Sequence, residues 1–99
     1  MDATITQGNT PTVVETNMQP GHYYIVRIYG SWGGCVGNLE TRLDTDDDTD
    51  WAPLEDGTGL SSNVDREWLC GGRELRFNPS VAGTPNLRTY VSVAEVVSR

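Results

Sequence analysis

Five aspartates fall within seven positions of the stretch LDTDDDTDWAPLEDG, which begins at Leu43. The alternating carboxylates, and the one at the twelfth position counted from the first of them, are Asp44, Asp46, Asp48, Asp50 and Glu55. This is the ligand spacing of an EF-hand calcium loop, in which oxygens wrap a hard cation and the last carboxylate binds it bidentately. Calcium binding is therefore the first function to consider for this stretch.

Two features of the same stretch argue against an EF-hand. The sixth position is Thr49, where the sharp turn of that loop calls for glycine. Pro53 and the extended segments on either side exclude the two flanking helices. A calcium loop built on a hairpin remains an alternative, but a solvated hairpin tip is the favoured interpretation. A catalytic acid pair would need a pocket and raised pKa values, which an exposed cluster does not provide.

Other residue types that support chemistry are sparse. His22 is the single histidine, so it is the only imidazole base available to a Ser-His-Asp assembly. Cys35 and Cys70 form no CxxC motif, and we expect free structural thiols rather than a bridge or a zinc site. The glycine pairs 33–34 and 71–72 precede no helix and are expected in turns. We therefore predict no catalytic residues and no cofactor.

Aromatic side chains are the remaining candidates for binding. They are Tyr23, Tyr24, Tyr29, Tyr90, Trp32, Trp51 and Trp68. Such rings could stack on sugar rings, but the favoured interpretation is that they fill the core or a subunit contact.

The composition limits the partners. The formal net charge is −7, and all seven basic residues are arginine. An acidic chain without basic clusters is repelled by nucleic acid and by anionic lipid, so neither is an expected partner. No apolar run approaches the roughly 18 residues of a membrane span. The opening MDATITQGNT lacks the basic and apolar regions of a signal peptide, which favours the cytosol as the place of synthesis and assembly.

The elements that must position these residues are short extended runs between Gly, Pro, Asn and Asp. Strands are expected at 3–6, 10–16, 22–30, 35–43, 50–54, 73–78 and 87–97, and 60–64 together with 66–70 form one weaker extended region. Residues 64–69 could instead form one helical turn, and 79–86 should be a loop. In the run 35–43, alternate residues from Cys35 to Leu43 are expected to point inward.

About seven or eight strands without a helical period predict an all-β fold, a single antiparallel β-sandwich of jelly-roll or Ig-like type. Residues 1–99 form one domain, with 1–16 either an N-terminal arm or an edge strand. The predicted core is Tyr24, Val26, Ile28, Leu39, Leu75, Phe77, Val91 and Val93.

Four stretches, GHYYIVRIYGSWGG, DWAPLEDG, GGRELRFN and TYVSVAEVV, follow one another from Gly21 onward. In this order they resemble a group of small bacteriophage virion proteins of about a hundred residues. The resemblance implies a virion structural protein that decorates or cements a capsid, and it carries no catalytic residues. The additional acidic residues at 44–50 and Cys70 depart from that pattern.

The resulting functional expectation is a non-enzymatic bacteriophage head decoration protein, bound to the outer capsid surface and located in the virion. Its expected partners are the major capsid protein and copies of itself, for which a trimer would protect open strand edges. The alternative is a tail or fibre component that acts as a receptor-binding or carbohydrate-binding module.

Overall fold

The computed structural model describes residues 2–94, and within them all regular structure is β-strand. The strands are β1 Asp2–Ile5, β2 Thr12–Glu15, β3 His22–Ser31, β4 Val36–Arg42, β5 Ala52–Pro53, β6 Val64–Cys70, β7 Glu74–Val81 and β8 Asn86–Val93. No helix suited in length and hydrophobicity to crossing a membrane occurs in this part of the chain.

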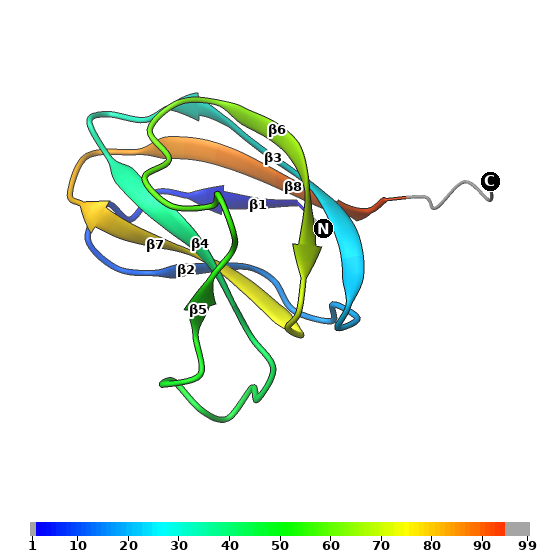
Figure 1. The fold of residues 1–99 in the computed structure, drawn as a ribbon. Coiled ribbons are helices and arrows are strands. Elements are labelled where there is room, and N and C mark those ends of the chain that lie inside the picture. Colours follow the sequence, from blue (N-terminus) through cyan, green and yellow to red (C-terminus); the bar gives the residue numbers. More distant parts are fainter. Residues whose placement is uncertain (1, 95–99) are drawn as a thin grey trace.

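The strands form two four-stranded antiparallel sheets packed face to face (Figure 1). Sheet A has the order β1-β8-β3-β6 and sheet B the order β2-β7-β4-β5. The β-sandwich expected from the sequence is thus confirmed. Of the two topologies left open, the strand order is that of a jelly roll, whose eight strands are shared between two sheets.

Each of the first four strands pairs with one of the last four in reverse order: β1 with β8, β2 with β7, β3 with β6 and β4 with β5. The chain is therefore a long hairpin that is rolled up. Its tip is the loop between β4 and β5, which contains the aspartates and extends away from the sheets in Figure 1. The position of this loop explains why it contributes little to the core.

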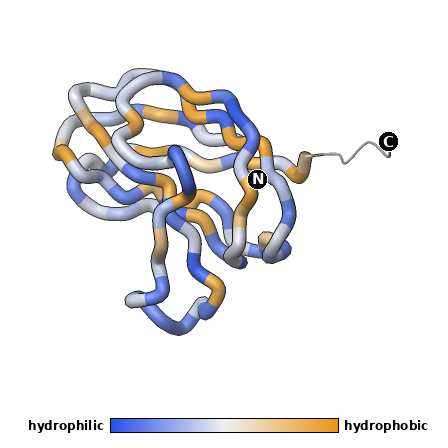
Figure 2. The backbone as a smooth tube through the Cα atoms, in the orientation of Figure 1, coloured by the Kyte–Doolittle hydropathy of each residue, from blue (hydrophilic) through white to orange (hydrophobic). Residues whose placement is uncertain are grey.

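The core lies between the sheets and follows the period-two alternation of the strands. Figure 2 shows hydrophobic and hydrophilic positions following one another along the strands. On β3, the alternate residues Tyr24, Val26 and Ile28 are buried. Seven of the eight residues predicted for the core are buried, together with Ile5, Val14, Met18, Leu54, Trp68 and Leu87. The period-two pattern was thus sufficient to identify most of the core.

Two residues predicted to point inward are exposed. Val93, the eighth residue of the predicted core, is 58% exposed because it is the last residue of β8, at the end of sheet A. Leu43 is 53% exposed because β4 ends at Arg42 and the chain has already left the sheet. Both errors concern strand ends, which side-chain alternation does not locate.

The extended region expected around 60–70 is confirmed for residues 64–70, which form the continuous strand β6, and the alternative of a helical turn at 64–69 is wrong. Two other local boundaries differ from those expected. Pro79, expected in a loop, lies within β7 opposite Gly37, where the register with β4 shifts. The last strand begins at Asn86 and ends at Val93, and the part of its predicted range beyond Ala94 lies outside the described residues.

The N-terminal segment forms two edge strands. β1 pairs with β8 along all four of its residues, and β2 pairs with β7. Ile5 is fully buried, and Thr89 Oγ1 donates a hydrogen bond of 3.2 Å to the Ala3 carbonyl. Removing residues 1–9 would therefore expose core and destabilise the sandwich. A dispensable arm is not compatible with this packing.

Candidate binding face

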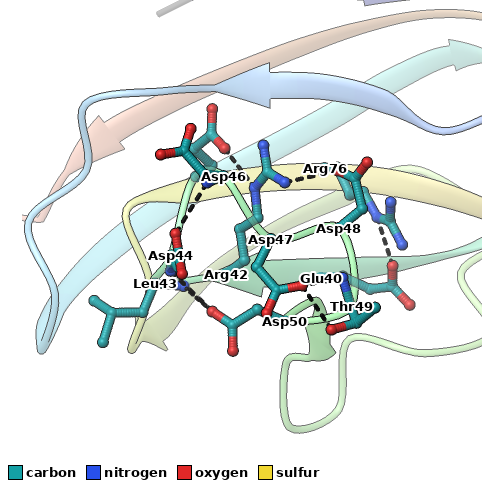
Figure 3. A network of polar contacts seen from close by, with 11 residues as sticks. Glu40, Arg42, Leu43, Asp44, Asp46, Asp47, Asp48, Thr49, Asp50 and Arg76 are labelled. Atoms are coloured by element: carbon teal, nitrogen blue, oxygen red, sulfur yellow. Dashed lines mark hydrogen bonds and ion pairs between the residues drawn. The ribbon is translucent and has the colours of Figure 1, made fainter.

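The aspartates of the β4–β5 loop accept hydrogen bonds from the loop itself (Figure 3). Asp50 Oδ2 accepts from the backbone N–H groups of Leu43 at 2.8 Å and Asp44 at 2.9 Å. Asp44 Oδ1 in turn accepts from the N–H of Asp46 at 3.0 Å. These carboxylates therefore close the tip of the hairpin by satisfying backbone donors that no strand partner reaches.

A further carboxylate closes the middle of the same loop. Asp47 Oδ1 accepts hydrogen bonds from the hydroxyl of Thr49 at 2.6 Å and from its backbone N–H at 2.8 Å. These two hydrogen bonds lower the pKa of Asp47 below its ordinary value, because they favour the ionised carboxylate. Asp47 therefore acts as a turn residue.

The five candidate calcium ligands are not brought together as one set. Asp48 binds Arg42, with 2.8 Å between Oδ1 and Nη1, whereas Glu55 follows β5 in a separate turn. Within residues 2–94, no group of three or more His, Cys, Asp or Glu side chains could hold a metal ion. The loop geometry is that of a hydrogen-bonded hairpin tip.

The outer face of sheet B carries a charged cross-strand pattern, which we call the ion-pair face. Glu40 on β4 lies opposite Arg76 on β7, and their Oε1 and Nε atoms are 2.7 Å apart. Two residues farther along β4, Arg42 lies opposite Glu74, and the distance between Arg42 Nε and Glu74 Oε1 is 2.6 Å. The hydrogen bond to Glu74 raises the pKa of Arg42 above its ordinary value.

Trp51 covers this network. The Trp51 ring lies 4.6 Å from the guanidinium carbon of Arg42 and 4.3 Å from that of Arg76. Each of the four charged side chains is less than one-fifth exposed. The face is therefore satisfied within the chain, by ion pairs and by cation–π contacts.

The outer face of sheet A has the opposite character, and we call it the tyrosine face. Tyr23 on β3 lies opposite Leu69 on β6. Farther along β3, Arg27 lies opposite Tyr90, and Tyr29 lies opposite Arg88 on β8. Its exposed large apolar side chains are Tyr23, Tyr29, Leu69 and Tyr90, each about half exposed.

The arginines of this face are poorly paired. Arg27 makes one exposed ion pair, with Asp65 at 3.3 Å. The Arg88 side chain has no ion-pair or hydrogen-bond partner among residues 2–94. Exposed tyrosine and arginine side chains are the types enriched at protein contacts, because they combine a large apolar surface with polar groups. The tyrosine face is therefore the candidate binding surface.

The aromatic residues singled out from the sequence fall into three groups. Tyr24 and Trp68 are core residues. Trp32 packs edge-to-face on Phe77, with 5.9 Å between ring centroids, and Trp51 covers the ion-pair face. The tyrosine face takes the other three, Tyr23, Tyr29 and Tyr90.

The other candidates for chemistry are placed as follows. His22 begins β3 with an exposed side chain. Cys35 and Cys70 are buried free thiols, and burial raises the pKa of Cys70 to about 11. Gly33 and Gly34 have positive φ angles of 56° and 82° in the β3–β4 turn, so this pair has a backbone role.

Arg27 and Arg88 were not anticipated as site residues. Their signal was present in the sequence, because each alternates with tyrosine at a spacing of two, in RIY and in RTY. What the sequence lacked was the register that places the two segments side by side on β3 and β8.

The chain matches no protein-family model, and no curated protein sequence or solved structure is significantly similar to it.

Proposed function

We propose that this chain is a bacteriophage virion structural protein that binds the outer surface of the capsid and stabilises or decorates it without catalysis. The resemblance of its sequence from Gly21 onward to small virion proteins motivates this assignment. A compact jelly roll with an exposed apolar patch at one end of an outer face suits a module that adds to a larger surface. Its acidic charge of −7 discourages adhesion to DNA and to other particles.

The observation that carries the proposal is the apolar end of the tyrosine face. Tyr23 and Leu69 lie directly opposite each other on β3 and β6, 47% and 55% exposed. Partly buried Ile25 is the next outward residue along β3. We call Tyr23, Ile25 and Leu69 the attachment patch. The chain as a whole is hydrophilic, with a mean hydropathy of −0.44, so this patch stands out on its surface. Covering the patch with a neutral apolar partner removes apolar surface from water, which favours binding.

The partner that we assign to the attachment patch is the major capsid protein. A role for residues 1–9 as an attachment arm is not part of the proposal, because β1 belongs to the sandwich and Ile5 to its core. Copies of the chain itself are the second expected partner. Among residues 2–94, β6 pairs on one side only, with β3, and a closed assembly such as a trimer would cover edges of this kind.

The test is whether the chain purifies with virus particles, and at what copy number. A head decoration protein follows the symmetry of the shell and is expected at a copy number on the order of hundreds. A handful of copies would place the chain at the tail, and absence from particles would remove the virion assignment.

A matched pair of variants tests the attachment patch. Leu69→Arg should lower particle occupancy at least about tenfold, because it places a charge in an apolar contact. Tyr29→Ala, on the same face but outside the patch, should leave occupancy unchanged. Equal occupancy by Leu69→Arg and the unmodified chain would exclude this patch as the attachment surface.

A further inference from the structure

A groove of about 410 Å³ lies on the tyrosine face, where β3 meets the start of β6. Its lining residues are Arg27, Tyr29, Asn63, Val64 and Asp65. Tyr29 is 46% exposed, so part of its ring is accessible from the groove. An exposed aromatic surface beside an amide, a carboxylate and a guanidinium offers both stacking and hydrogen bonding to a small ligand.

The amide of Asn63 is held in one orientation. Its Oδ1 atom accepts hydrogen bonds from the Gly30 backbone N–H at 3.2 Å and from Trp32 Nε1 at 3.0 Å. Because both donors engage the oxygen, the Nδ2 group is left as a fixed donor, and it has no acceptor among the described residues. A donor that is already oriented binds a ligand without a large loss of conformational entropy.

The other two polar residues of the groove neutralise each other. Arg27 Nε and Asp65 Oδ1 are 3.3 Å apart, and both side chains are more than half exposed. Over residues 2–94, the second oxygen of Asp65 and the terminal nitrogens of Arg27 have no partner. The groove thus offers further donors and acceptors but little net charge, on a chain that is itself strongly acidic.

We infer that this groove binds one ring of a neutral hexopyranoside, with Tyr29 stacked against the C–H face of the sugar. Asn63 Nδ2 donates a hydrogen bond to one ring hydroxyl. Asp65 accepts from a second hydroxyl, and Arg27 donates to a neighbouring oxygen. A pyranose ring fits this set because it presents an apolar face and a rim of hydroxyl groups at once. An anionic sugar fits less well, since Asp65 already neutralises Arg27.

The groove is separate from the attachment patch. Tyr29 and Tyr23 are six positions apart on β3, which is about 20 Å of extended strand. Sugar binding therefore does not depend on the proposed function, and each could fail without the other.

The experiment is a heteronuclear NMR titration of the ¹⁵N-labelled full chain with the methyl glycosides of glucose, galactose, mannose and N-acetylglucosamine. We expect at least one glycoside to shift the amide signals of Tyr29, Asn63 and Asp65. The expected Kd is on the order of millimolar, because so open a groove covers only one side of the ligand. Absence of shifts with all four glycosides would overturn the inference.

Two tyrosines of nearly equal exposure serve as a matched pair. Tyr29→Ala should weaken binding about tenfold or more, because it removes the stacking surface, and Tyr29→Phe should retain it. Tyr23→Ala, 47% exposed on the same strand, should leave the Kd unchanged. Equal weakening by Tyr29→Ala and Tyr23→Ala, or none by Tyr29→Ala, would contradict the assignment to this groove.

Asn63→Asp tests the fixed donor. The substitution keeps the oxygen that holds Gly30 and Trp32 but removes the N–H group, so the loop should persist while the Kd rises about tenfold. Unchanged Trp32 fluorescence in the unliganded variant would report that the loop is intact. Methyl glucuronide should bind more weakly than methyl glucoside, and the reverse order would show that the groove selects anions.

Discussion

The two outer faces of this sandwich use the same cross-strand geometry with different chemistry. On the ion-pair face, Glu40 lies opposite Arg76, and Arg42 lies opposite Glu74. Each arginine therefore has a carboxylate as its direct neighbour, and Trp51 covers both. This face gains little from an external partner, because its charged groups are already desolvated and paired.

On the tyrosine face the arginine neighbours are aromatic. Arg27 lies opposite Tyr90, and Arg88 lies opposite Tyr29. Tyrosine supplies no countercharge, so within residues 2–94 Arg88 has no ion-pair partner and Arg27 has only its exposed pair with Asp65. The rings stay about half exposed. A tyrosine in place of the cross-strand carboxylate therefore leaves the arginine exposed, and a face built in this way is suited to binding.

Among the variants that test the difference between the two faces, Trp51→Ala is expected to change the free energy of unfolding most. Loss of the ring exposes both arginines of the ion-pair face and removes two cation–π contacts. The free energy of unfolding should fall by about 2–3 kcal/mol, measured by urea denaturation. A change no larger than that of Tyr90→Ala would mean that the ring does not stabilise the network.

Arg76→Met should have the next largest effect, a loss of about 1–2 kcal/mol in the free energy of unfolding. The variant keeps most of the apolar stem but leaves Glu40 with only the amide of Asn78 at 3.2 Å. Arg88→Met on the tyrosine face is the matched control and should stay within about 0.5 kcal/mol of the unmodified chain. Equal losses would remove the distinction between the two faces.

The buried thiol of Cys70, in the core between the two faces, should make the stability of the chain depend on pH in the alkaline range. Burial raises the pKa of Cys70 to about 11 from an ordinary value of 9.0. Between pH 9 and 11 the folded chain keeps the thiol proton, whereas the unfolded chain has lost it. The free energy of unfolding is therefore unaffected by this group below pH 9 and falls as the pH rises from 9 toward 11. Stability should fall by up to about 1 kcal/mol per pH unit there.

Cys70→Ala should flatten that part of the profile, as measured by urea denaturation at a series of pH values. An identical slope in the variant would place its origin elsewhere. In the unmodified folded chain, both buried thiols should resist alkylation at neutral pH, and both should react after unfolding.

The smallest effects are expected in the β4–β5 loop. Asp50→Ala removes the acceptor for two backbone N–H groups and should cost about 1 kcal/mol, whereas Asp46→Ala should cost close to nothing. Millimolar calcium should leave the melting temperature of the chain unchanged. A calcium-dependent rise that disappears in Asp46→Ala would show that the loop rearranges into a cation site.

The sequence predicted the architecture because alternation survives in the longest strands. Tyr24, Val26 and Ile28 mark the buried side of β3 without any knowledge of its neighbours. Val93 and Leu43 were misplaced because alternation does not tell where a strand ends or where the opposite sheet stops covering it. The Asp-rich stretch was correctly placed in a turn, since its tip connects β4 and β5.

The two faces could not be predicted in the same way. Arg42 and Glu74 are 32 positions apart in the chain, and their pairing depends on the register between β4 and β7. Trp51 reaches the same arginines from beyond the loop. Local composition therefore indicated candidate residues, but only the fold distinguished the largely buried arginine pairs from the exposed arginines.

Hydroxyl-radical footprinting can show whether the tyrosine face contacts the partner while the ion-pair face does not. The chain would be oxidised free in solution and bound to virus particles. We expect Tyr23 and Leu69 to be protected on particles, while the oxidation of Trp51 on the opposite face is unchanged. Protection of Trp51 without protection of Tyr23 and Leu69 would contradict this expectation.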